Sequence, residues 1–168
     1  MCDGKLKLTG DVLALLLGSG GSVKEETTRF PPKELEGYGK CVLYGKEHLV
    51  SIDYFWYSDR TTDLKARMSP SPSTVKTFKV GSATGYIEEE QVRVPIPCSV
   101  TSDGEKIQLF EVIVRQGPAL RKFDDELGKA FASAATTAAR YLGGKIYDCS
   151  AVQSGVSSGP SSPSPSNA

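Results

Sequence analysis

The sequence has few of the residues on which catalytic and metal sites depend. It contains one histidine, His48, and four cysteines that are far apart and form no Cys-x-x-Cys pair. The usual zinc-finger and thioredoxin spacings are therefore absent, and the shortage of imidazole and thiolate ligands argues against a transition-metal site. The acidic runs at 88–90 and 124–126 do not have the spacing of a calcium loop. We predict no metal and no bound cofactor.

An excess of charge of one sign is also missing. The chain has 20 basic and 20 acidic residues. Nucleic-acid binders normally carry a basic excess, so nucleic acid is not a predicted partner. No run of about 18 apolar residues occurs, and no membrane span is predicted. The apolar stretch at 12–17 is too short to span, and its flanks lack the charged start and the cleavage site of a signal peptide.

The cysteines are compatible with two redox states. A chain of 168 residues can build a core without disulfides. Two disulfides remain possible, but we expect free thiols. This predicts an intracellular, reducing compartment, such as the cytoplasm or the plastid stroma. The four cysteines are Cys2, Cys41, Cys98 and Cys149.

Composition divides the chain into three regions. Residues 1–30 hold an apolar segment followed by a Gly/Ser stretch at 18–22. Residues 31–152 have the composition of a folded domain, and we expect it to be of the α+β class. Residues 153–168 are rich in Ser and Pro and are predicted to be disordered, because they contain almost nothing that a core could bury.

The stretch LALLLGSGGS, residues 13–22, is the most motif-like part of the chain. A dinucleotide loop needs a third glycine, but Val23 stands at that position, and no helical pattern follows. We therefore interpret the glycines as a flexible leash.

The leash would hold residues 5–17, for which three interpretations stay open. Asp11 could cap a short helix that offers an apolar face to a groove on a partner. The sequence KLKLTG could instead add as a strand to a sheet edge. The segment could also complete the core of its own domain. The apolar face of the first interpretation consists of Leu13, Leu16 and Leu17.

Several segments alternate as strands. Residues 40–45 and 48–57 are separated by a short turn and predict a β-hairpin. Residues 75–80, 91–100 and 106–114 are further strands, the last two joined by an Asp-Gly turn. Prolines at positions 95 and 97 predict that their strand is irregular or at an edge. The polar segment 58–74 is predicted to be a long exposed loop.

One long helix is predicted over 118–142. Pro118 suits a first helical turn, and apolar residues recur at three- and four-residue steps. Gly143 is expected to stop this helix with a left-handed cap. Residues 144–152 would form a last strand. The order predicts an α+β fold, in which an antiparallel sheet packs against one long C-terminal helix that is followed by a final strand.

Two of these elements offer candidate contact surfaces for a protein partner. The middle of the helix has small side chains that would let another backbone approach, and its candidate contacts are Phe131, Ala134 and Ala138. The aromatic run at 54–57 points alternately to two faces of its strand, so one pair must leave the core unless something covers it. We take Tyr54 and Trp56 as the partner-binding pair. Packing inside the domain is the alternative for both elements.

Two stretches resemble the small rod-cap and core linker domain of phycobilisomes. They are LFEVIVRQ at 109–116 and RYLGGKIYDCSAV at 140–152. The resemblance implies a non-enzymatic linker lodged among pigment proteins. Some relatives carry a bilin on cysteine, which makes Cys41, Cys98 and Cys149 candidates for a thioether-linked pigment.

The predicted function is a non-enzymatic protein-interaction or assembly module of the scaffold or linker type. It would belong to a larger assembly, which the resemblance implies to be a light-harvesting complex, with its tethered N-terminal segment docked on a sheet edge or groove. The alternative is a small cysteine-dependent enzyme that uses Cys41 as nucleophile and His48 as base.

Overall fold

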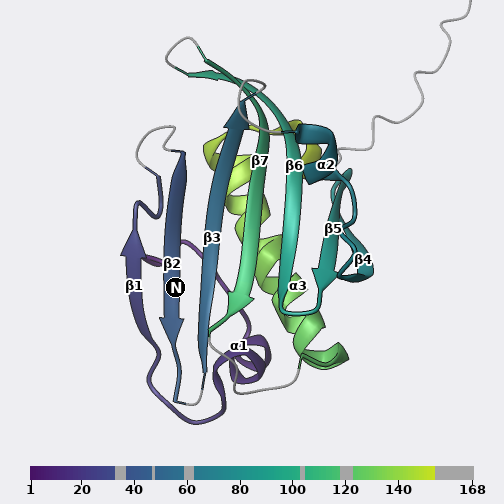
Figure 1. Ribbon diagram of the computed structural model, residues 1–168. Helices are drawn as coiled ribbons and strands as arrows, with labels where there is room; N and C mark the ends of the chain where they lie inside the picture. The colour runs from purple at the N-terminus through teal and green to yellow at the C-terminus, as the bar shows by residue number, and fades with distance from the viewer. Residues whose placement is uncertain (33–36, 47, 59–62, 103–104, 118–122, 154–168) are drawn as a thin grey trace, which may run out of the picture.

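Seven antiparallel strands form one sheet in the computed structural model (Figure 1). The structure describes residues 1–32, 37–46, 48–58, 63–102, 105–117 and 123–153. The strand order across the sheet is β1-β2-β3-β7-β6-β5-β4. The strands are β1 (Lys24–Thr28), β2 (Tyr38–Tyr44), β3 (Leu49–Ser58), β4 (Thr74–Val80), β5 (Ala83–Glu88), β6 (Gln91–Ser102) and β7 (Glu105–Gln116).

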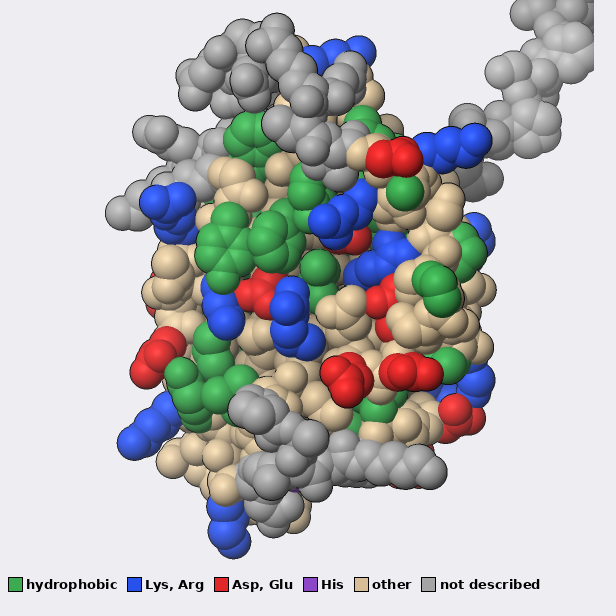
Figure 2. All heavy atoms as spheres, viewed as in Figure 1, with side chains coloured by type: hydrophobic (Ala, Val, Ile, Leu, Met, Phe, Trp, Pro, Cys, Tyr) green, Lys and Arg blue, Asp and Glu red, His purple; other side chains and the backbone are tan. Residues whose placement is uncertain are grey.

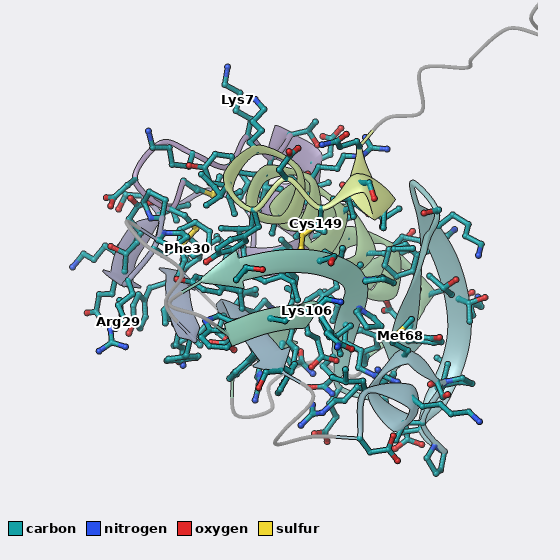
Figure 3. The ribbon with its side chains drawn as sticks, turned by 90° about the horizontal axis from the view of Figure 1, so that it is seen from above. Lys7, Arg29, Phe30, Met68, Lys106 and Cys149 are labelled. Atoms are coloured by element: carbon teal, nitrogen blue, oxygen red, sulfur yellow. A yellow bond between two sulfur atoms is a disulfide. The ribbon has the colours of Figure 1, made fainter. Side chains whose placement is uncertain are left out.

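Helices cover one face of this sheet and leave most of the other without a helix. The helix α3 crosses behind the strands in Figure 1, and α1 packs beside it. Figure 3 shows the same arrangement from above, with α3 on one side of the sheet and α2 on the other. The helical elements are α1 (Gly10–Leu17), α2 (Leu64–Met68), α3 (Asp125–Ala139), a π-helical turn η1 (Arg140–Ile146) and a 3₁₀ turn η2 (Ser150–Val152).

The core lies between α3 and the sheet. Alternate residues of β3, β7 and β6 point to it, and those in the middle of the strands are buried. Small residues on the inner face of α3 let the helix lie close to the strands. The central inward-facing residues are Ile52, Tyr54, Val92, Val94, Ile96, Phe110, Val112 and Val114 from the sheet and Leu127, Phe131, Ala134, Ala135 and Ala138 from α3.

The N-terminal segment belongs to this core. Leu6, Leu16 and Leu17 are each 1% exposed. Thr9, rather than Asp11, caps α1, because its side chain accepts a hydrogen bond from the backbone of Val12. The residues after the Gly/Ser stretch continue as β1, which pairs with β2. Of the three interpretations left open for residues 5–17, the structure therefore has the one in which they complete the domain's own core.

Apart from the final strand at 144–152, the predicted β-strands are present, and the hairpin of β2 and β3 has the expected position. The segment 58–74 is not all loop, because it contains α2. The strand β6 lies inside the sheet, not at its edge. Its two prolines are tolerated because β6 pairs with β5 only at Val92 and Arg93, so the prolines lie beyond the end of that pairing.

The C-terminal prediction is wrong in two respects. The regular α-helix is shorter than predicted: it begins at Asp125, with Asp124 as its N-cap, and Pro118 lies outside the described residues. Residues 144–152 do not form the predicted final strand, because 140–146 form a π-helical turn and 150–152 a 3₁₀ turn. Gly143 is not a left-handed cap. The packing leaves little room for a side chain at this position, because a Cβ there would press on Ile96 and Val152.

Both cysteine pairs form disulfides, so the expectation of free thiols in a reducing compartment is wrong. Cys2 bonds to Cys41, which fastens the N-terminal segment to β2. Cys98 bonds to Cys149, which fastens the chain after α3 to β6 (Figure 3). Disulfides persist in oxidising environments, and two of them indicate such an environment for this chain.

In the part of the chain that the structure describes, no helix is long and apolar enough to cross a membrane. This agrees with the sequence prediction that the chain has no membrane span.

Candidate functional site

The structure buries six of the eight predicted contact residues. Their side chains fill the space between α1, α3 and the sheet, so they are not on a surface that a partner could reach. Leu13 and Trp56 are partly buried and also pack against the core. The six buried residues are Leu16, Leu17, Tyr54, Phe131, Ala134 and Ala138.

The aromatic run of β3 divides between the two faces of the sheet, as alternation requires, but the pairs are exchanged. Tyr54 is fully buried on the α3 side, where its hydroxyl donates a 2.6 Å hydrogen bond to the carbonyl of Arg29. Trp56 points to the same side. Phe55 and Tyr57 therefore point to the opposite face, which neither α1 nor α3 covers and which we call the helix-free face, although the short helix α2 lies over one end of it. The sequence showed that one pair must leave the core, but not which pair.

The proposed Cys41–His48 dyad is absent. Cys41 is fully buried and bonded to Cys2, so it has no thiol that could act as a nucleophile. The other cysteines are also in disulfides, and none has a free thiol for a bilin. Among the described residues, no group of three or more His, Cys, Asp or Glu side chains could hold a metal ion.

The helix-free face is the best candidate site that the fold offers. Strand register places its side chains in rows across β2, β3, β7 and β6. One row contains Tyr38, Phe55, Glu111 and Pro95; the next contains Lys40, Asp53, Ile113 and Arg93. A third row contains Val42, Ser51, Arg115 and Gln91. Aromatic and charged residues are thus neighbours on this face.

Three aromatic rings are neighbours on this face and form a group that we call the aromatic row. Tyr38 lies across from Phe55, and Tyr57 follows Phe55 along β3. The ring centroids of Tyr38 and Phe55 are 5.1 Å apart, and those of Phe55 and Tyr57 are 6.4 Å apart. All three side chains are partly exposed. The guanidinium of Arg67 lies over the Tyr57 ring at 4.8 Å, the distance of a cation–π contact. Figure 2 shows hydrophobic side chains gathered on this face, with both basic and acidic side chains beside them.

An ion pair lies beside the aromatic row. Nε of Arg115 is 3.2 Å from a carboxylate oxygen of Asp53, and Ser51 donates a 3.0 Å hydrogen bond to the same carboxylate. Asp53 is buried, whereas Arg115 is exposed. Burial, followed by the negative charge of Asp53, raises the pKa of the Tyr38 hydroxyl. Asp53 thus ties an exposed arginine to the sheet.

Glu111 is the most deeply buried charged residue of the face, with 0% exposure. One of its oxygens accepts hydrogen bonds from Arg67 at 3.1 Å and from Tyr57 at 3.2 Å. The other has no hydrogen-bond partner and lies 3.6 Å from a nitrogen of Arg93. Burial raises the pKa of Glu111 despite the lowering effect of the two arginines. Burial and the Glu111 charge raise the pKa of Tyr57 to about 12.

Arg93 fastens α2 over this end of the face. Its Nε donates a 2.6 Å hydrogen bond to Glu88, and its other nitrogens donate to the backbone carbonyls of Arg67 and Ser69. Burial disfavours the charge of Glu88, but hydrogen bonds from Gln91, Arg93 and Ser71 together lower its pKa. Arg93 is only 7% exposed. It is thus a structural clamp that holds Arg67 above Glu111.

Sequence analysis did not find this face. One signal was available: charged residues occur inside apolar strands, at Asp53, Arg93 and Glu111. Charged residues are almost never fully buried unless they are paired. Three of them inside strands that otherwise carry apolar side chains therefore indicate a network of paired charges.

Comparison of the chain with protein-family models, with curated proteins and with solved structures finds no match.

Proposed function

We propose that this chain is a non-enzymatic binding module that contacts a protein partner through the helix-free face of its sheet. The observation that carries the proposal is the aromatic row with the arginines beside it. Tyrosine, phenylalanine and arginine are enriched in the cores of protein interfaces, and tyrosine and arginine recur among residues that dominate binding energy.

The rigidity of the site supports the same function. The aromatic row stands on the neighbouring strands β2 and β3, and its flanking arginines are each tied to a buried carboxylate. Groups that are ordered before binding lose less conformational entropy when a partner arrives. The two disulfides fit a binding module that operates in an oxidising environment.

The assembly role in a light-harvesting complex stays a prediction. It rested on the resemblance of two short stretches, one of which now forms β7 and the other the turns after α3. The two disulfides indicate an oxidising environment and not the reducing compartment that was predicted together with that role. We therefore carry forward the interaction module and not the pigment assembly.

Affinity capture with matched variants tests the proposal. Phe55→Ser removes a partly exposed ring from the centre of the aromatic row. Tyr141→Ser is the control, because it removes a partly buried ring from η1 on the other side of the sheet. We expect the disulfide-bonded wild-type protein and Tyr141→Ser to retain the same partner from an extract of the source organism, and Phe55→Ser to lose it.

Binding energy concentrated in central aromatics predicts a loss of at least tenfold in the amount retained. Circular dichroism must show that both variants fold. Equal retention by Phe55→Ser and the wild type would place the binding surface elsewhere and refute the proposal.

A further inference from the structure

The geometry points to the chemistry of the partner: we propose that the helix-free face recognises an acidic polypeptide segment in extended form, with an apolar side chain between two carboxylates. This inference rests on the proposed function and adds the charge and spacing of the partner to it.

The positive charges of this face are more exposed than the negative charges with which they pair. The side chain of Arg115 is 44% exposed and that of its partner Asp53 is 5% exposed. The side chain of Arg67 is 43% exposed and that of its partner Glu111 is 0% exposed. In both pairs the carboxylate lies against the sheet and the guanidinium lies above it. A partner that approaches this face therefore meets cations and aromatic rings, although the chain as a whole has a formal net charge of +0.

The guanidiniums of Arg67 and Arg115 have N–H donors that their ion pairs do not use. A guanidinium has five N–H donors. Arg115 contacts Asp53 through Nε, and Arg67 contacts Glu111 through one terminal nitrogen. Within the described residues neither guanidinium makes another hydrogen bond or ion pair, and Lys40 makes none. The face thus offers charged donors that a carboxylate can bind.

The spacing of two of these cations matches the spacing of side chains along an extended chain. Lys40 stands opposite Asp53, and Arg115 lies two strands away and one row further along. With strands about 4.8 Å apart and about 3.3 Å per residue, their Cα atoms are about 12 Å apart. Residues i and i+4 of an extended chain span about 13 Å, and residue i+2 projects to the same side. Carboxylates at i and i+4 would thus reach the two cations, and an apolar residue at i+2 would lie over β3 between the apolar side chains of Val42 and Ile113.

Acidic residues limit where such a segment lies. Glu89 and Glu90 are exposed in the turn between β5 and β6. Figure 2 shows acidic side chains gathered low on the same face, apart from the hydrophobic group. Glu26 of β1, which is exposed and stands opposite Val42, repels such a segment at the other side. Repulsion from both sides favours a binding position between them, over β2, β3 and β7.

Fluorescence anisotropy with labelled synthetic peptides tests the inference on the full, disulfide-bonded chain. The probe is a peptide of two tandem copies of Glu-Ser-Leu-Ser-Glu. One control peptide replaces each Glu with Lys, and a second replaces each Leu with Ser. We expect the wild-type protein to bind the probe, to bind it more weakly as salt rises, and to bind either control at least tenfold more weakly.

Variants locate the binding. Lys40→Gln and Arg115→Gln should each weaken binding of the probe roughly tenfold, the value of one hydrogen bond to a charged group. Lys129→Gln, on the exposed side of α3, is the matched control and should bind as the wild type does. Lys40 makes no ion pair with the described residues, so Lys40→Gln remains informative if loss of the Arg115 pair destabilises the fold.

The inference is overturned if the wild type fails to bind the probe, if it binds the basic peptide equally well, or if Lys40→Gln has no effect. Binding to phosphatidylserine vesicles or to heparin in place of the probe would overturn it in favour of another anionic partner. Loss of partner capture in Phe55→Ser with full capture in both charge variants would refute the acidic segment and leave the proposed function intact. Full capture in all three would refute both.

Discussion

Removal of the Cys98–Cys149 disulfide should cost this protein a large part of its stability. The bond joins residues 51 apart in sequence, and a cross-link of that length removes loop entropy worth about 4 kcal/mol from the unfolded chain. The Cys2–Cys41 bond, with a separation of 39, gives nearly the same value, about 4 kcal/mol. Domains are typically stable by about 5–15 kcal/mol in total.

The perturbation is the pair of substitutions Cys98→Ala and Cys149→Ala. Alanine is preferred to serine because both positions are buried, and a hydroxyl there would add its own cost. We expect the melting temperature to fall by about 8–16 °C, since each kcal/mol is worth about 2–4 °C in a chain of this size. The matched pair Cys2→Ala and Cys41→Ala should give a similar fall.

The assay is thermal unfolding followed by circular dichroism, with and without a phosphine reductant. The reductant should lower the melting temperature of the wild type and have little effect on a variant that lacks both bonds. A thiol count in guanidinium chloride without reductant is the direct check. Four reactive thiols in protein from its native source would refute both the disulfides and the oxidising environment.

The sequence allowed the strands to be predicted because their period of two survives in any context. The hairpin of β2 and β3 and the pairing of β6 with β7 followed from alternation and from turn residues. The Asp-Gly turn itself lies outside the described residues. The strand β1, with the sequence KEETT, has no apolar residue to alternate and was invisible for that reason.

The site could not be predicted because it depends on which face the helices cover. Alternation in β3 places Tyr54 and Phe55 on opposite faces of the sheet but does not tell which face is buried. Only the position of α3 decides which ring is buried. The disulfides posed a similar problem. Four cysteines allow three pairings, and spacing alone does not show that β6 passes beside the end of η1. Both questions concern contacts between segments far apart in the chain.

Three further substitutions test the packing and the charges. Gly39→Ala should destabilise the fold by about 1–3 kcal/mol in urea unfolding, because a Cβ there would overlap the buried ring of Tyr54, whereas Gly10→Ala, which meets nothing, should be nearly neutral; equal effects would contradict the packing. Asp124→Ala should cost about 1 kcal/mol in the same assay, because it removes the N-cap bond of α3, and an unchanged unfolding midpoint would show that the cap is not needed. Glu111→Gln tests the buried carboxylate through its pH dependence. Burial raises the pKa of this carboxyl above its unfolded value, so the folded state binds the proton more readily than the unfolded state does. The protonated Glu111 therefore stabilises the fold at low pH, and this stabilisation is lost as pH rises through the folded pKa. Glutamine has no charge to desolvate, so the variant should melt above the wild type at pH 8, and the difference should shrink as pH falls toward 4. A variant that melts below the wild type at pH 8 would show that the two arginines stabilise the charged carboxylate by more than its burial costs.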